Sequence, residues 1–206
     1  YGSMLNYSGG WDRTAMTTQS GETWWDGQNG AGVGFYTDVR TFINIENLAV
    51  ARFNYGVHLV GNGGPFYYDD LQIVNCTVFG LFSTTPYLVL GGSAISKGCN
   101  YGVFVQYGSD KSEYQSIISR DCVTTCCLFQ YGGNRTVIKY LEVGNVPPGT
   151  SIFAGNNLQA GLVVQSGHFS HAAATFTNNG WPEQYLNNIE FYNVTSPLGS
   201  SGGASP

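Results

Sequence analysis

The segment NYGVFVQYG, residues 100–108, decides the fold because related segments return along the chain. Its central part, YGVFVQY, aligns with YGVHLVG (55–61), FGLFSTT (79–85), TCCLFQY (125–131) and AGLVVQS (160–166). This alignment places Gly56, Gly80, Gly102, Cys126 and Gly161 in register, at steps of 24, 22, 24 and 35 residues. A repeat of about 20 to 50 residues is typical of a solenoid or a propeller.

A second series of equivalent residues has nearly the same period. Cys76, Cys99 and Cys122 follow one another at 23 and 23 residues, and Arg52 takes the equivalent place in the first copy. Two series that share one period indicate a structural repeat rather than a chance similarity.

Each repeat contains short apolar or alternating stretches, such as FINIENLAV (42–50) and GVHLV (56–60), separated by Gly, Asn, Ser and Asp. These stretches predict strands, and the frequency of Gly argues against helices. A propeller blade needs about 40 residues, and the leucine-rich pattern is missing. The sequence therefore predicts an all-β fold, a right-handed parallel β-helix with about 22–24 residues per coil.

Stacked coils place equivalent residues beside one another, about 4.8 Å apart. We expect Gln106, Gln130 and Gln165 to stack where a strand gives way to a turn, with each amide bonding to the next. Tyr107 and Tyr131, which follow two of these amides, are expected to form an outward aromatic strip.

The five cysteines fit neither a disulfide framework nor a C-x₂-C metal pair. We expect reduced thiols that stack in the core as small apolar residues. A cross-coil disulfide and a metal site remain as alternatives. No metal and no other cofactor is expected.

The two ends of the chain differ from the middle. Residues 1–40 are expected to form an N-terminal cap or the first coil, and residues 41–195 the parallel β-helix. The stretch VPPGTSIFAGNN interrupts the period and predicts a loop excursion near 146–158. Residues 196–206 resemble a linker to a further module.

Charge and composition restrict the partners. Charged residues make up 10% of the chain, against roughly 25% in an ordinary domain, and the net charge is −5. No cluster of basic residues is present to neutralise phosphates, so we expect no nucleic-acid partner. No apolar run approaches the ~18 residues of a membrane span, so we expect no membrane insertion.

Short coils, low charge, turns rich in Gly, Asn, Ser and Tyr, and inward Cys and aliphatic stacks together resemble the pectin-lyase-like β-helix modules of bacteriophage tail spikes and tail fibres. The resemblance covers residues 40–195. It implies a location in the virion tail or otherwise outside the cell, a homotrimer beside other virion tail proteins, and binding of bacterial surface polysaccharide. The high aromatic content and the few charges also favour packing against further copies of the chain.

Two further functions remain open for this fold. One is a polysaccharide depolymerase, either a glycoside hydrolase or a lyase, and the other is a secreted cell-surface adhesin. A hydrolase needs two carboxyl groups about 5 to 9.5 Å apart. The weak candidates for these groups are Asp69, Asp70, Asp110 and Glu113.

Sugar binding requires flat aromatic side chains together with amides and carboxylates on an open surface. The predicted substrate-binding residues are Tyr107, Tyr131, Asp110, Glu113 and Asn134. A second aromatic group, formed by Trp11, Trp24 and Trp25 beside Asp26, is interpreted either as a sugar site or as a buried cap.

Overall fold

The computed structural model describes most of the repeated region and parts of both ends. The described residues are 3–6, 10–12, 17–19, 23–27, 32–38, 43–60, 65–84, 88–106, 112–130, 136–145, 151–156, 162–172, 176–179, 184–186 and 188–194. Within these ranges every regular element is a β-strand.

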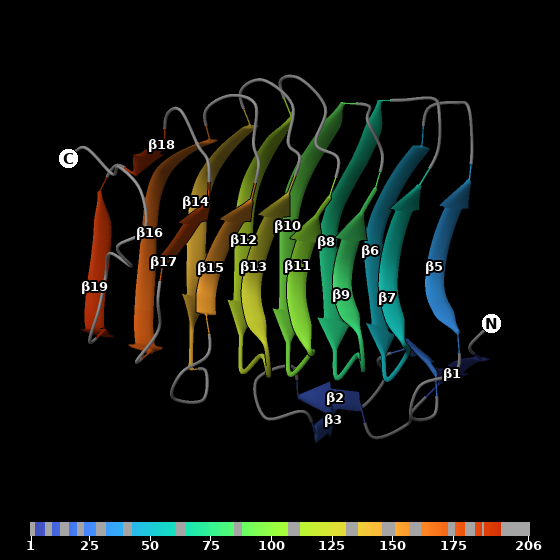
Figure 1. Ribbon diagram of the computed structural model, residues 1–206. Coiled ribbons are helices and arrows are strands. Elements are labelled where there is room, and N and C mark those ends of the chain that lie inside the picture. The colour runs from blue at the N-terminus through green and yellow to red at the C-terminus, as the bar shows by residue number, and fades with distance from the viewer. Residues whose placement is uncertain are drawn as a thin grey trace.

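The chain alternates between two sheets, and successive strands of each sheet follow one another along a single axis (Figure 1). The larger sheet has ten strands in the order β1-β4-β6-β8-β10-β12-β14-β16-β18, with β19 also paired to β16. The smaller sheet has seven strands in the order β17-β15-β13-β11-β9-β7-β5. Two short strands, β2 and β3, pair only with each other.

The strands of the larger sheet are β1 (Ser3–Asn6), β4 (Thr23–Asp26), β6 (Ile43–Ala51), β8 (Phe66–Val74), β10 (Val89–Lys97), β12 (Glu113–Arg120), β14 (Thr136–Gly144), β16 (Leu162–Ala172), β18 (Gln184–Leu186) and β19 (Ile189–Val194). Those of the smaller sheet are β5 (Val33–Asp38), β7 (Tyr55–Val60), β9 (Phe79–Ser83), β11 (Tyr101–Val105), β13 (Thr125–Gln130), β15 (Ser151–Asn156) and β17 (Phe176–Asn179). The remaining pair is β2 (Gly10–Asp12) and β3 (Thr17–Gln19).

Apart from the antiparallel pairs β1–β4 and β2–β3, neighbouring strands pair in parallel, and their partners lie about one period apart in the sequence. Leu71 pairs with Ala94, Ala94 with Ile117, and Ile117 with Leu141, which are steps of 23, 23 and 24 residues. Each coil thus contributes one strand to each sheet and places equivalent residues side by side. The all-β parallel β-helix prediction is confirmed as a parallel β-solenoid.

Strands of the larger sheet bend at their middle. In β8 the buried side chains Tyr68 and Leu71 are three residues apart, whereas a straight strand would alternate with a period of two. Between them Asp69 is exposed and Asp70 has a positive φ of 49°. Asn47 and Asn188 have φ values of 54° and 49°. Asp and Asn tolerate this left-handed region better than most residues. The same three-residue step between buried residues occurs in β10, β12, β14 and β16. Each of these strands therefore has a first and a second segment that face different directions.

A second corner joins the larger sheet to the smaller one. Its residues share a left-handed backbone with φ between 55° and 66°, and they are Arg52, Asn75, Gly98, Asp121 and Asn145. Each donates its backbone N–H to a carbonyl of the next coil, as Asn75 does to Lys97 at 2.9 Å. The equivalence of Arg52 with Cys76 was therefore wrong. Arg52 is equivalent to Asn75 of the next coil. Phe53 is therefore the residue that occupies the position of Cys76 in the preceding coil.

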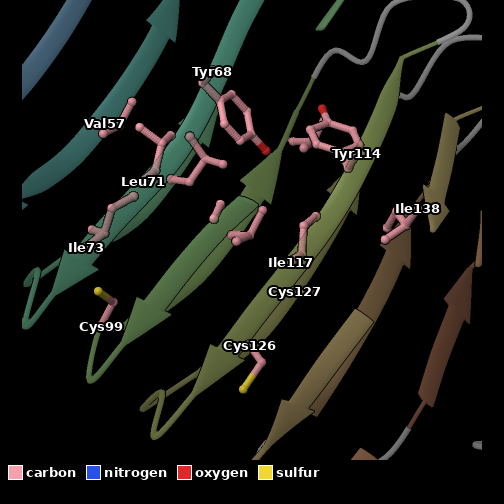
Figure 2. Close-up of a cluster of buried hydrophobic side chains, with 14 of the residues drawn as sticks. Val57, Tyr68, Leu71, Ile73, Cys99, Tyr114, Ile117, Cys126, Cys127 and Ile138 are labelled. Atoms are coloured by element: carbon pink, nitrogen blue, oxygen red, sulfur yellow. The ribbon is translucent and has the colours of Figure 1, made fainter. Parts of the chain in front are cut away.

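The core lies between the two sheets and consists of inward rows with one residue per coil. Figure 2 shows part of it, including Leu71, Ile117 and the cysteines Cys99, Cys126 and Cys127. All five cysteines are buried and carry free thiols. The backbone N–H of Cys76 donates to the sulfur of Cys99 over 3.3 Å. The prediction of stacked, reduced thiols in the core is confirmed for this ladder.

The glycine series of the repeat also lies inside, at the start of the smaller sheet. Gly56, Gly80 and Gly102 are buried, and a Cβ added to any of them would meet the backbone oxygen of the equivalent residue in the next coil within 3 Å. The next member is Cys126, as predicted. The following one is Ile152 rather than Gly161, because Thr125 pairs with Ser151 and Cys127 with Phe153.

The predicted loop excursion near 146–158 contains a strand that the sequence did not suggest. Ser151–Asn156 form β15, which pairs in parallel with β13. Residues 146–150 and 157–158 lie outside the described ranges. At the N-terminus β4 pairs in parallel with β6, and β5 with β7, so residues within 23–38 belong to a first coil. The proposed linker, 196–206, lies outside the described residues.

Candidate functional site

The first segments of the larger sheet carry an outward surface on which exposed polar side chains lie beside partly buried apolar ones, and we call it the polar face. Along each strand its side chains alternate with buried ones, such as Ile45, Tyr68, Tyr114 and Ile138. The polar face consists of Asn44, Glu46, Tyr67, Asp69, Leu90, Gly92, Glu113, Gln115, Val137, Lys139, Val163 and Gln165. It offers hydrogen-bonding groups on most strands from β6 to β16.

Two of the predicted site residues lie on the polar face, and four lie outside the described residues. Asp69 in β8 and Glu113 in β12 are separated by β10 alone, so the fold brings them to one surface. Tyr107, Asp110, Tyr131 and Asn134 lie outside the described residues. In the sequence they stand between the residues of β11 and β12 and between those of β13 and β14. The aromatic strip of Tyr107 and Tyr131 therefore stays a prediction.

Glu113 forms the most connected group of the polar face. Its Oε1 accepts from Nε2 of Gln115 at 2.8 Å and lies 2.6 Å from Nζ of Lys139 on the neighbouring strand. The hydrogen bonds from Lys139 and then Gln115 hold the pKa of Glu113 below its usual value. A general acid needs a raised pKa to hold its proton near neutral pH. Glu113 is therefore set up as a hydrogen-bond acceptor and not as a general acid.

Asp69 has a local structural role at the bend of β8. Its Oδ1 accepts the backbone N–H groups of Asp70 at 2.9 Å and of Ser93 at 2.8 Å. A side chain at Gly92 would overlap this carboxylate, so the glycine leaves room for it. Asp70 accepts from Nε2 of Gln72 at 2.9 Å.

A carboxylate pair does occur on the polar face, at Glu46 and Asp69, which pair across β6 and β8. Glu46 accepts from Nδ2 of Asn44 at 2.7 Å, and both carboxyl groups are exposed. Neither is enclosed by apolar groups, which is the usual way to keep one acid protonated. The arrangement favours binding of hydroxyl groups over general acid and base catalysis.

The predicted amide stack of Gln106, Gln130 and Gln165 is wrong for its third member. Gln106 follows β11, where its N–H donates to Ser83 at 2.8 Å, and the register of β11 and β13 continues to Gln130. Gln165 lies instead in β16 of the larger sheet, on the polar face beside Lys139. The side chain of Gln130 is outside the described set.

The outward surface of the smaller sheet carries a second feature, an aromatic ladder. It has two rows, Tyr36, His58, Phe82 and Phe104 in one and Tyr55, Phe79 and Tyr101 in the other. Ring centroids of His58 and Phe82 are 4.5 Å apart, and those of Phe82 and Phe104 are 5.1 Å apart, at interplanar angles of 22° and 21°.

The stacking decides what this ladder can bind. Because His58, Phe82 and Phe104 stack on one another, the flat faces between them, which a sugar would need, are already covered. Tyr36 meets His58 edge-on at 71°, and the rings of the second row are tilted by 43° and 39° to one another. Phe82 and Phe104 are only 8% and 7% exposed, while Tyr36 at the end of the row is 51% exposed. His58 is held among these rings, and its Nε2 lies 3.3 Å from Oγ1 of Thr84. We interpret the aromatic ladder as a contact between coils, which leaves the polar face as the candidate site.

No match is found for this chain among protein-family models, curated proteins or solved structures. The candidate site therefore rests on its own geometry. Across the described ranges no three His, Cys, Asp or Glu residues come together as a metal site would require. The same residues include no helix with the length and apolar character of a membrane span.

The functional residues that the sequence did not single out are Glu46, Gln115 and Lys139. Each is one residue away from a buried position of the repeat. The sequence could have indicated these residues only through their position in the repeat, which alternates with the buried positions. Their residue types gave no further indication, because they differ from coil to coil.

Proposed function

We propose that this chain is a host-attachment segment of a viral tail spike or tail fibre, and that it binds bacterial surface polysaccharide along the polar face. The observation that carries the proposal is the repetition of exposed hydrogen-bonding side chains along a solenoid axis. A polymer of hydroxylated units presents donors and acceptors at intervals, so a long and open row of such groups suits it.

The chemistry of the polar face supports this ligand. Carboxylates and amides, such as Glu113 and Gln115, accept hydrogen bonds from sugar hydroxyls, and the amide and Lys139 also donate. Half-buried Tyr67, on the strand between Asn44 and Leu90, adds a ring at the same surface. Neighbouring strands are about 4.8 Å apart, so the face from β6 to β16 extends for about 24 Å, which suits an oligosaccharide rather than a single sugar.

The proposal includes assembly into a homotrimer together with other virion tail proteins, and a place outside the host cell. The composition supports self-association, because charged residues make up 10% of the chain and aromatic residues 15%. Few charges oppose the packing of such a chain against further copies of itself. Light scattering of the full-length protein at micromolar concentration tests this part, and a monomer would remove it.

Affinity electrophoresis tests the binding function. The purified chain is run through gels that contain capsular or lipopolysaccharide chains from a panel of bacteria. We expect at least one of them to retard the wild-type chain. The double variant Glu113→Ala, Gln115→Ala should lose most of this retardation. Val123→Ala, a change at a 63% exposed side chain outside both the polar face and the aromatic ladder, is the control and should keep it.

Circular dichroism of each variant confirms that it folds before its mobility is compared. Equal retardation of the double variant and the wild type would show that the polar face is not the binding surface. Release of reducing ends from the retarding polysaccharide would instead identify the chain as a depolymerase.

A further inference from the structure

The thiols of the core are arranged in pairs that the proposed binding function does not use. Cys76 and Cys99 occupy the same position after β8 and β10, two residues beyond the paired residues Val74 and Lys97. Both are buried, at 1% and 0% exposure. Their placement raises the question of whether the fold holds them in the geometry of a cross-link.

The backbone keeps these two residues side by side. Asn75, before Cys76, donates its N–H to the carbonyl of Lys97 at 2.9 Å, and Asn100, after Cys99, donates to the carbonyl of Cys76 at 3.1 Å. Hydrogen bonds on both sides fix the two chains at the spacing of parallel strands, about 4.8 Å. Disulfides span Cα separations of about 4.4 to 6.8 Å, and the spacing of adjacent coils lies within this range.

The sulfur of Cys99 also accepts two hydrogen bonds, which make it easier to deprotonate than a thiol with apolar neighbours alone. It accepts the N–H of Cys76 at 3.3 Å and the hydroxyl of Ser96 at 3.5 Å. Burial by itself raises the pKa of the Cys99 thiol, but the hydrogen bonds from Cys76 and Ser96 outweigh burial and lower it. The hydrogen bond with Cys99, and then burial, raises the pKa of Cys76. Cys99 is therefore the member of the pair that loses its proton first.

The other thiols are directed elsewhere. Cys122 interacts with Cys126 of its own coil and with the hydroxyl of Ser119 at 3.5 Å. Cys126 points toward the carbonyl of Gly144 at 3.8 Å. Cys122 shares the ladder and also interacts with Cys99, but the hydrogen bond from the Cys76 N–H directs the Cys99 sulfur toward Cys76.

We propose that Cys76 and Cys99 form an oxidation site, at which a small hydroperoxide converts the two thiols into a disulfide between neighbouring coils. The Cys99 thiolate attacks the outer oxygen of the peroxide, the O–O bond breaks, and the other oxygen leaves as an alkoxide, or as hydroxide when the oxidant is hydrogen peroxide, so that Cys99 becomes a sulfenic acid. The Cys76 sulfur then attacks the Cys99 sulfur, and the S–O bond breaks. The proton of Cys76 leaves with the oxygen as water. The two sulfurs lose two electrons in total and the peroxide gains them.

Such a bond would close a loop of one full coil and restrict the unfolded chain. Disulfides act largely by this restriction, so the oxidised protein should unfold at a higher temperature. Burial makes the reaction slow, because the oxidant must enter a closed core.

The test uses the folded full chain treated with hydrogen peroxide, followed by maleimide alkylation in denaturant and trypsin digestion without reductant. Cleavage after Arg52, Lys97, Lys111, Arg120 and Arg135 puts Cys76, Cys99 and the group Cys122, Cys126 and Cys127 into three separate peptides. We expect one linked pair, 53–97 with 98–111, loss of two of the five thiols, and a melting temperature that rises by several degrees and falls again with reductant.

Cys99→Ser and Cys76→Ser should each abolish this link, whereas Cys127→Ser, a buried thiol outside the pair, should keep it. A link from 98–111 to 121–135, a disulfide within 121–135, or five intact thiols after treatment that oxidises the urea-unfolded chain would each overturn the proposal. Peptide mapping of the wild type decides among these outcomes even if one serine variant fails to fold.

Discussion

Ser119 in β12 fills the space in front of Gly102 in β11, and a methyl group on Gly102 would overlap the Ser119 hydroxyl. The same methyl would lie 2.6 Å from the carbonyl oxygen of Cys126. That carbonyl is fixed because it accepts the Ser119 hydroxyl at 2.8 Å. The glycine at this repeat position is therefore required by close packing between coils.

Gly102→Ala should destabilise the protein by about 1–3 kcal/mol, because overpacking forces backbone and side chains apart. Urea unfolding followed by circular dichroism measures the change. Cys126→Ala is the matched control, since this equivalent position of the next coil already holds a Cβ, and it should cost less. Equal stability of Gly102→Ala and the wild type would show that the coils are not packed as closely as described.

Cys99→Asp should destabilise the protein strongly. The site is fully buried, with a thiol, a hydroxyl and a backbone N–H as its polar neighbours, and it has no cation to pair with a carboxylate. Cys99→Ala, which removes only the sulfur, should cost on the order of 1–2 kcal/mol through the small cavity. Thermal unfolding compares the two. A melting temperature of Cys99→Asp close to that of Cys99→Ala would contradict the inward position of this residue.

Stability should fall on acidification through His58. Burial among the rings of the aromatic ladder lowers the pKa of His58 from 6.5 to about 4. The unfolded chain takes up a proton near pH 6.5 while the folded chain resists it, so the contribution is complete above pH 6.5 and is lost as pH falls toward 4. His58→Phe, which extends the stack of Phe82 and Phe104, should lose less stability than the wild type in this window.

Urea unfolding at several pH values between 4 and 7 measures this difference. The comparison of the two proteins removes the contribution of other acidic groups. Parallel stability curves for the wild type and His58→Phe would mean that His58 titrates normally.

The core could be predicted from the sequence because packing restricts it in every coil. The ladder of Cys76, Cys99 and Cys122 and the glycines Gly56, Gly80 and Gly102 keep one residue type where space is fixed. Repetition of one residue type did not reveal Phe53, because this phenylalanine occupies the position that holds a cysteine in the following coils. It also did not reveal Ile152, because Pro147 and Pro148 nearby favoured a loop over the strand that follows.

The candidate site could be predicted only in part, because solvent does not restrict residue type as packing does. Asp69 and Glu113 could be predicted as candidates because they are acids. The face on which Asp69 lies depends on the bend at Asp70, and the positive φ of this bend does not follow from the residue type alone. The aromatic ladder could have been predicted from the repeat itself. Tyr55, Phe79 and Tyr101 precede the three glycines of the repeat and are aromatic in each case.

The placement of Gln115 and Lys139 side by side on the polar face decides both the register of the coils and the proposed binding surface. Pyrene labels on Gln115→Cys and Lys139→Cys measure it, because two pyrenes give excimer emission only when they meet. The five native thiols are buried and should stay unlabelled in the folded chain. The control pair, Glu46→Cys with Lys139→Cys, is four strand spacings apart, about 19 Å. We predict strong excimer emission from the first pair and monomer emission from the control. Monomer emission from both pairs, or excimer emission from the control, would contradict the stacking of coils that places these residues on one face.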